Sequence, residues 1–131
     1  MTQTVVVTGG AGFIGHHLVN FLSKTKRVVV LENFARGEAE RLNSSSKNVI
    51  LKRCDIQQYT EVQKALEDFT ISEFYHLAAI NGTDNFYKFP VEIMNVGVLG
   101  CVNILRYMAE NRIQTGVFAS SAEVYQDCPI I

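Results

Sequence analysis

Residues 4–15 read TVVVTGGAGFIG, a short β-branched run followed at once by a glycine-rich turn. The glycines Gly9, Gly12 and Gly15 stand three residues apart, and the chain then continues with the apolar spacing of a helix. In a strand-to-helix turn of this kind, a small backbone lets a pyrophosphate approach the helix N-terminus. The sequence therefore predicts a dinucleotide-binding turn, in which Gly9 makes the turn, Gly12 allows the close approach and Gly15 the tight contact between helix and sheet.

Two other interpretations of the turn compete with this one. The glycines would also serve a tight strand-to-helix connection without any ligand, although three of them at this spacing favour the ligand. A Walker phosphate loop needs Gly-Lys followed by Ser or Thr, whereas this chain continues as Gly15, His16 and His17. The adjacent histidines have no carboxylate or cysteine at metal-ligand spacing, which argues against a zinc site.

The second element of a dinucleotide site is an acidic residue at the end of the second strand. Glu32 ends the next β-branched run, 17 residues after Gly15. A carboxylate at this place accepts hydrogen bonds from the ribose hydroxyls and repels a 2′-phosphate, which favours NAD over NADP. Arg36 lies nearby and would hold a phosphate in the opposite case. An ordinary solvated loop acid is the other interpretation of Glu32.

Short β-branched runs alternate with stretches of helical spacing along the chain. Near-continuous apolar runs are typical of parallel strands that are covered on both faces. Strand-helix-strand repeats of this kind have right-handed crossovers. The sequence therefore predicts an α/β fold, an open doubly wound parallel sheet of five strands in the order 3-2-1-4-5. The expected strands cover residues 4–8, 27–31, 49–52, 73–77 and 116–119.

Three segments between these runs carry the spacing of amphipathic helices. They cover residues 14–22, 62–69 and 90–111, and Pro90 suits the first turn of the last helix. The apolar stripe of this last helix is either buried core or a surface for self-association. The stripe consists of Val91, Met94, Val98, Cys101, Leu105 and Met108. The polar residues 35–47 are expected to form a loop with at most a short helix.

Length and composition restrict the class of protein. The 131 residues suffice for one domain and are too few for two, and 47% hydrophobic residues allow a real core. The 12 basic and 13 acidic residues give a net charge of -1, which argues against a nucleic-acid binder or a polybasic membrane module. No apolar run approaches the ~20 residues that span a bilayer, and three widely spaced cysteines suggest neither disulfides nor zinc. A soluble, cytoplasmic chain is expected.

Further motifs follow the later strands in a fixed order. They are DI at residues 55–56, HLAA at 76–79, NV at 95–96 and SSAEVY at 120–125. Together with the glycine turn, they resemble the extended short-chain dehydrogenases/reductases, and within them the NAD-dependent epimerase/dehydratase family. The resemblance covers essentially all 131 residues. It implies a Rossmann-like NAD-binding domain and a hydride transfer between a carbon of a nucleotide sugar and NAD.

The resemblance also implies roles for single residues. Asp55 is expected to accept a hydrogen bond from the adenine amino group, while the Ile56 backbone fixes the ring edge. Ser121 matches the family's catalytic serine or threonine, whose hydroxyl binds the sugar oxygen that is oxidised; without the family it would be taken as a helix cap or turn. His76 is expected to be a hydrogen-bonded core residue. The implied cofactor-binding residues are Gly9, Gly12, Phe13, Ile14, Gly15, Glu32, Asn33, Asp55, Ile56, Leu77, Ala78, Ala79, Asn95 and Ser120.

One catalytic element of the family is missing from the sequence. Family members use a Tyr-x-x-x-Lys pair, in which the lysine and the cofactor charge depress the pKa of the tyrosine so that it takes the sugar hydroxyl proton. None of the five tyrosines has a lysine four positions later. The chain is therefore expected to be the NAD-binding portion of such an enzyme, an incomplete domain at residues 1–131 that lacks the substrate domain and is inactive by itself.

Two alternatives remain beside that expectation. The chain would otherwise be a non-catalytic dinucleotide-binding or sensing module, or one half of a split enzyme whose other chain supplies the Tyr-x-x-x-Lys helix. A sheet that stops after its fifth strand leaves an open edge and an apolar patch, so a homo-oligomer is expected. A nucleotide sugar is the expected substrate of the complete enzyme, with no nucleic acid, membrane or metal among the partners.

Overall fold

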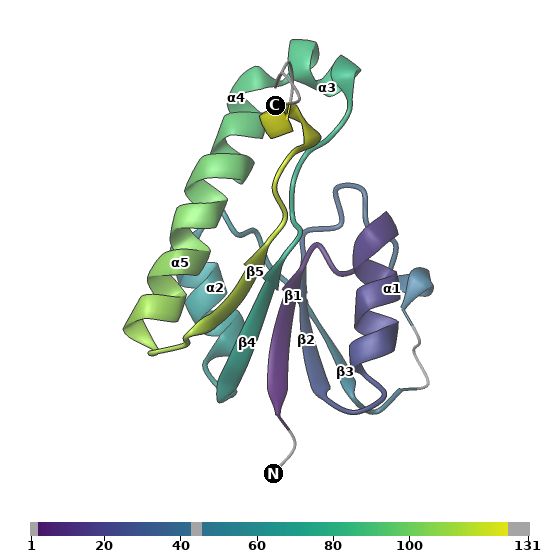
Figure 1. The fold of residues 1–131 in the computed structure, drawn as a ribbon, viewed down its shortest axis with the longest axis vertical. Coiled ribbons are helices and arrows are strands. Elements are labelled where there is room, and N and C mark those ends of the chain that lie inside the picture. The colour runs from purple at the N-terminus through teal and green to yellow at the C-terminus, as the bar shows by residue number, and fades with distance from the viewer. Residues whose placement is uncertain (1–2, 43–45, 126–131) are drawn as a thin grey trace, which may run out of the picture.

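The structure is a computed structural model that describes residues 3–42 and 46–125. Its centre is one parallel sheet of five strands in the order β3-β2-β1-β4-β5 (Figure 1). This fold class and this strand order are those that the sequence predicted. The strands are β1 (Thr4–Thr8), β2 (Arg27–Glu32), β3 (Val49–Arg53), β4 (Ile71–His76) and β5 (Thr115–Phe118).

The central strands are buried on both faces of the sheet. Val5, Val6 and Val7 of β1 are completely buried, and so are the three valines at 28–30 of β2. Because successive side chains of a strand point to opposite faces, Val6 belongs to one core cluster while Val5 and Val7 belong to the other. Two core layers of this kind require helices on both sides of the sheet, which is the doubly wound arrangement.

Helices cover each core layer (Figure 1). Helix α1 (Phe13–Leu22) packs against one face, while α2 (Tyr59–Leu66) and one long helix cover the other. The long helix is built from α4 (Pro90–Met94), a π-helical stretch η2 (Asn95–Gly100) and α5 (Cys101–Glu110). The remaining elements are α3 (Thr83–Lys88), which the sequence analysis did not anticipate, and the 3-10 turns η1 (Ala39–Arg41) and η3 (Ala122–Tyr125).

Of the stripe noted in the sequence, only Met108 lies on the buried face of the long helix. Val91, Met94, Val98 and Leu105 of that stripe are 49–71% exposed, so their assignment to the core is wrong. The buried residues of this helix are Val96, Gly100, Asn103, Ile104, Tyr107 and Met108. Because this helix has apolar residues on more than one side, periodicity alone does not tell which side meets the sheet.

The long helix is apolar over most of its length. Within the described residues, Pro90–Glu110 is one helix of 21 residues whose length and composition would also suit a membrane span, and an 18-residue window of it has a mean hydropathy of 1.3. Its buried face packs on α2 and the sheet, as helices of an α/β domain do. Packing against the core accounts for the apolar residues on the buried face of the helix, whereas the apolar residues of the outer stripe remain exposed.

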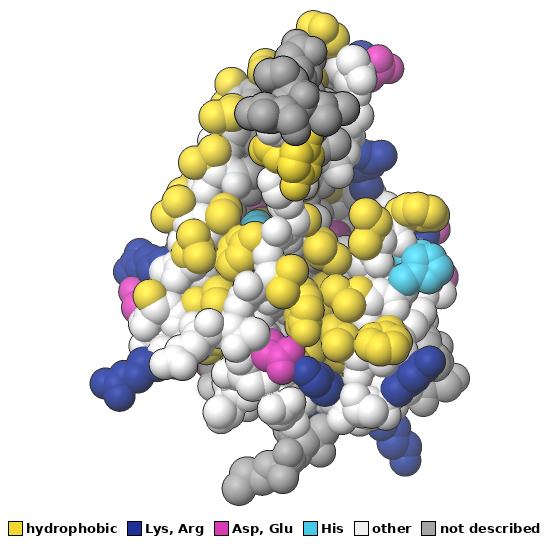
Figure 2. All heavy atoms as spheres, viewed as in Figure 1, with side chains coloured by type: hydrophobic (Ala, Val, Ile, Leu, Met, Phe, Trp, Pro, Cys, Tyr) yellow, Lys and Arg dark blue, Asp and Glu magenta, His cyan; other side chains and the backbone are white. Residues whose placement is uncertain are grey.

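The outermost strand β5 leaves hydrophobic surface uncovered. Among the described residues β5 pairs only with β4, and its Val117 is 52% exposed. Figure 2 shows hydrophobic side chains gathered on the face between α1 and the long helix, over the strands of the sheet. Open strand edges and apolar patches favour association with further polypeptide.

Candidate dinucleotide-binding site

A pocket of about 610 Å³ lies at the carboxyl ends of the strands. It is lined by the glycine turn after β1 and by the loops that follow the other four strands. The strand order reverses between β1 and β4, and ligands of open α/β sheets bind in the crevice at such a switch point. The lining includes Gly9, Gly12, Phe13, Ile14, Gly15, Glu32, Asn33, Asp55, Ile56, Leu77, Ala78, Ala79 and Ser120, all of which the sequence analysis had singled out.

The glycine turn brings the main chain close to the pocket. Gly9 has a φ of 68°, a conformation that favours glycine, and its N–H donates to the Leu31 carbonyl at 2.9 Å. A Cβ on Gly9 would lie 2.9 Å from the backbone of Ala78, so a larger residue would separate β1 from the loop after β4. A Cβ on Gly12 would meet only the Gly9 carbonyl oxygen, which leaves the pocket side of Gly12 open to a ligand.

The helix-to-sheet contact assigned to Gly15 is made by another glycine. A Cβ on Gly15 would overlap the carbonyl oxygen of Gly9 and lie 2.7 Å from Gly10 Cα, so Gly15 packs against the turn itself. A Cβ on Gly10 would lie 2.8 Å from Val30 in the sheet and 3.0 Å from Val19 in α1. Gly10 therefore determines how closely α1 approaches the sheet, because only its backbone lies between Val19 and Val30.

Glu32 ends β2 and points into the same pocket, with only 7% of its surface exposed. Its Oε2 accepts a hydrogen bond from the Ala11 N–H of the glycine turn, and its Oε1 accepts one from the Phe34 N–H, both at 3.2 Å. The interpretation of Glu32 as a solvated loop acid is therefore wrong. Arg36, the competing phosphate ligand, is exposed and donates from Nη1 to the Asn81 carbonyl at 2.6 Å.

The loop after β3 is positioned by a buried amide from the long helix. Asn103 donates from Nδ2 to the carbonyl oxygens of Ile56 and Gln57 at 2.8 and 2.9 Å. A Cβ on Gly100 would lie 2.6 Å from Ile56 Cδ1, so the glycine lets the Ile56 side chain reach the helix. The half-buried Asp55 carboxylate accepts from the Gln57 N–H at 3.0 Å. Asn103 was not predicted from the sequence, because the apolar pattern of the long helix does not show which of its sides is buried.

A buried hydroxyl ties β1 to the loop after β4. The Thr8 Oγ1 lies 2.7 Å from His76 Nδ1 and accepts hydrogen bonds from the N–H groups of Leu77 and Ala78 at 3.2 Å. A threonine hydroxyl has one hydrogen and two acceptor sites, so it donates its hydrogen to His76, whose Nδ1 is then unprotonated. His76 is thus a hydrogen-bonded core residue, as expected from the sequence.

Acidification from pH 7 to pH 5 is expected to destabilise the fold through His76. Burial lowers the pKa of His76 below its ordinary 6.5, so at intermediate pH the unfolded chain binds a proton that the folded chain does not. The free energy of unfolding therefore falls as the pH drops through the unfolded pKa toward the folded one. Thermal melts followed by circular dichroism should show a flatter pH profile for H76F than for the wild type. Equal slopes would contradict this, and H17N, at an exposed histidine, serves as the control.

The thiol of Cys54 lies in the pocket wall and should be unreactive. Burial, with a smaller contribution from the negative charges of Glu61 and Asp55, raises the pKa of Cys54 to about 12. Because the thiolate is the reactive species, iodoacetamide at pH 8 should modify the half-buried Cys101 well before Cys54. Peptide mass spectrometry of the native chain tests this, and the unfolded chain, in which both should react, is the control.

Two of the residues implied by the family, Asn95 and Ser121, are not among the residues that line the pocket. Ser120 lines the pocket after β5. Asn95 is exposed at the start of η2, while its neighbour Val96 lines the pocket. Ser121 is exposed and directly precedes η3, where its carbonyl accepts the Val124 N–H at 3.3 Å. The functional roles of Asn95 and Ser121 remain predictions.

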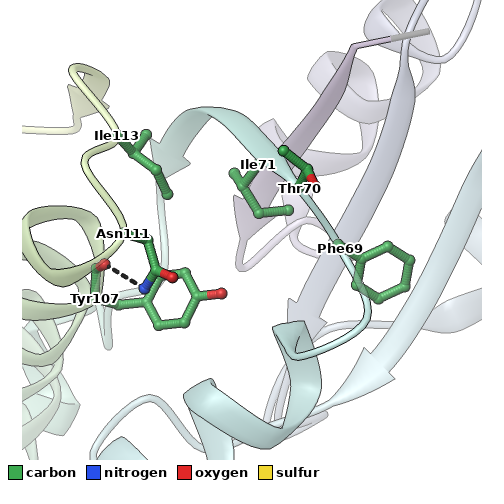
Figure 3. A pocket seen from close by; sticks show the side chains of 6 residues that line it. All are labelled: Phe69, Thr70, Ile71, Tyr107, Asn111 and Ile113. Carbon is green, nitrogen blue, oxygen red and sulfur yellow. Dashed lines mark hydrogen bonds between the residues drawn. The ribbon is translucent and has the colours of Figure 1, made fainter. Parts of the chain in front are cut away.

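A smaller hollow of about 160 Å³ lies at the amino end of β4, at the opposite end of the sheet from the site (Figure 3). The Asn111 side chain there donates to the Tyr107 carbonyl at 2.9 Å, as the dashed line in Figure 3 shows. Its other lining residues are Phe69, Thr70, Ile71 and Ile113. Within the described residues, no group of three or more His, Cys, Asp or Glu side chains has an arrangement that would hold a metal ion.

Comparison with known proteins agrees with this geometry. The sequence model of the NAD dependent epimerase/dehydratase family matches residues 5–131. The chain belongs to this family. The UDP-glucose 4-epimerase of Pasteurella multocida is 32% identical over 134 residues, which cover 98% of this chain and 40% of that protein.

Solved epimerase structures have the same fold as this family member. The Thermus thermophilus UDP-glucose 4-epimerase in complex with NAD is 34% identical, with a TM-score of 0.83 over 91% of this chain and 38% of that one. The Bifidobacterium longum UDP-glucose 4-epimerase in complex with NAD⁺ and UDP is 26% identical, with a TM-score of 0.86 over 95% and 38%. The chain thus spans about two fifths of the length of these three relatives. NAD, the cofactor expected from the sequence, is the one on which the family depends.

Proposed function

We propose that this chain binds NAD as the cofactor-binding portion of a sugar-nucleotide epimerase or dehydratase. The observation that carries the proposal is the N-terminus of α1, whose first N–H groups border the pocket that Glu32 also lines. The N-cap of α1 is Gly12, which has no side chain to cap these N–H groups. A helix N-terminus with open N–H groups attracts a pyrophosphate through its hydrogen bonds and its dipole.

The rest of the pocket fits the other parts of NAD. Its volume of about 610 Å³ is that of a cofactor site. The Glu32 carboxylate would accept from the adenosine ribose hydroxyls, and Asp55 with the Ile56 main chain would hold the adenine edge. The small side chains of Ala78, whose N–H donates to the Thr8 hydroxyl, and of Ala79 leave room beneath the adenosine and the pyrophosphate.

The chemistry proposed for the complete enzyme is a reversible oxidation of a UDP-sugar. Bound NAD would supply a hydride acceptor for a sugar carbon, and the complete enzyme would then return the hydride or eliminate water. Ser121 would hydrogen-bond the sugar oxygen that is oxidised. Without a Tyr-x-x-x-Lys pair these 131 residues have no phenolate to take the sugar hydroxyl proton, so the isolated chain should turn over no substrate.

Calorimetric titration of the purified 131-residue chain with NAD⁺ tests the proposal. Saturable heat and a rise of the melting temperature with NAD⁺ are expected, together with no conversion of UDP-glucose to UDP-galactose. No heat at saturating NAD⁺ would refute the binding site, and measurable conversion would refute the inactivity of the isolated chain. Turnover that returns on mixing with a chain that supplies the Tyr-x-x-x-Lys helix would identify a split enzyme.

We also propose that the exposed stripe of the long helix binds a second copy of this chain. The uncharged residues Val91, Met94, Val98, Val102 and Leu105 follow one another at spacings of 3, 4, 4 and 3, which is the pattern of a helix-to-helix seam, and all are about half exposed or more. Sedimentation should show a dimer that V98E/V102E converts to a monomer. A monomer at high wild-type concentration would refute this interface. We further propose that the protein is soluble and cytoplasmic and that it has no nucleic-acid or membrane partners.

A further inference from the structure

The Glu32 carboxylate is held between two loops rather than standing free in the pocket. The N–H of Ala11 reaches Oε2 from the glycine turn, and the N–H of Phe34 reaches Oε1 from the loop after β2. A carboxylate has about four lone-pair sites, so two of them remain for the hydroxyls of a ribose. The orientation of this acid is therefore fixed by main-chain groups before any ligand binds.

The loop after β2 folds back over the carboxylate. Asn33 Oδ1 accepts the Ala35 N–H at 3.0 Å, and Phe34 has a φ of 61°, a conformation that residues other than glycine adopt at some cost. The Glu38 N–H then donates to the Ala11 carbonyl at 3.2 Å, which joins the far end of the loop to the glycine turn. These contacts bring the residue at position 37 directly against the end of the Glu32 side chain.

Gly37 provides the space that the carboxylate occupies. A Cβ at this position would lie 2.7 Å from both Cδ and Oε2 of Glu32, and 3.0 Å from Oε1. All three atoms belong to the far end of a flexible side chain, whereas no backbone atom is met within the same distance. A side chain at position 37 would therefore displace the carboxylate and leave the backbone of the fold in place.

We propose that Gly37 determines the cofactor specificity of this site, because its missing side chain keeps the Glu32 carboxylate where it binds the ribose hydroxyls and repels a 2′-phosphate. The inference rests on the proposed NAD function. Arg36 and Arg41 line the same pocket, so displacement of the carboxylate leaves positive charge for a 2′-phosphate to meet. Gly37 acts through Glu32 and is a positioning residue.

The test is to titrate NAD⁺ and NADP⁺ into the wild type, G37A, E32A, E32A/G37A and E32D/G37A. We expect G37A to weaken NAD⁺ binding about tenfold, the cost of losing a charge-assisted hydrogen bond, and to reduce the preference for NAD⁺ over NADP⁺ to that of E32A. G37A should change nothing further in the E32A background. The shorter acid of E32D/G37A should restore the preference for NAD⁺. G97A is the matched control, because a Cβ at Gly97 meets no atom within 4 Å.

The possible results separate this inference from the proposed function. If the wild type binds neither dinucleotide, the proposed function itself fails. If the wild type prefers NAD⁺ and G37A keeps the same ratio of affinities, the role of Gly37 is refuted and the NAD site stands. If G37A unfolds before it can be titrated, the two double variants decide the question. An equal preference for NAD⁺ over NADP⁺ in E32A/G37A and E32D/G37A would refute the role of Gly37. A preference for NAD⁺ that returns only in E32D/G37A would support it.

Discussion

Replacing Gly15 by alanine should weaken NAD⁺ binding about 100-fold and destabilise the fold by about 1–3 kcal/mol. The new Cβ would overlap the Gly9 carbonyl oxygen and lie too close to Gly10 Cα. Both are backbone atoms, which cannot rotate away as the end of a side chain can. The turn must therefore open, and its N–H groups then leave the position from which they would bind a pyrophosphate. Calorimetry with NAD⁺ and urea unfolding measure the two effects.

The control for this prediction is again G97A, a glycine-to-alanine change in a helix where the added Cβ has open space. It should bind NAD⁺ as the wild type does and be slightly more stable, because alanine favours a helix over glycine. A G15A chain with wild-type affinity would show that the turn is not the pyrophosphate site.

Replacing Thr8 by valine is expected to cost about 2–3 kcal/mol of unfolding free energy, although the two side chains have nearly the same shape. The Thr8 hydroxyl is completely buried, and its loss leaves His76 Nδ1 and the Ala78 N–H without the partner that they have now. Leu77 keeps the Thr8 carbonyl as an acceptor at 3.2 Å, which limits the damage to two groups. Urea unfolding followed by circular dichroism gives the loss.

The matched control for T8V is T115V, the same substitution on the exposed strand β5. Its effect on stability should stay within about 0.5 kcal/mol, as for most surface substitutions. Because the Thr8 hydroxyl also holds the loop that lines the pocket, T8V should weaken NAD⁺ binding as well. Equal stabilities of T8V and T115V would exclude the network as a determinant of the fold.

The sequence alone determined the frame of this domain and the place of its site. The β-branched runs marked all five strands to within two residues at either end, and the glycines at 9, 12 and 15 marked the turn that faces the pocket. These features are local: a buried parallel strand needs continuous apolar residues, and a turn at φ of 68° favours glycine. Glu32 was found because the end of the second strand lies at the same edge of a parallel sheet as the turn.

Only the tertiary structure decided which groups meet across that edge. In the structure, Gly10 and not Gly15 makes the close contact between helix and sheet, and Asn103 donates a hydrogen bond to the loop after β3. Gly37 lies directly against the Glu32 carboxylate. The tertiary structure also turned the stripe at 91–105 of the long helix outward. Such contacts join residues far apart in the chain, so their partners are fixed by how the layers pack and leave no periodicity in the sequence from which they could be predicted.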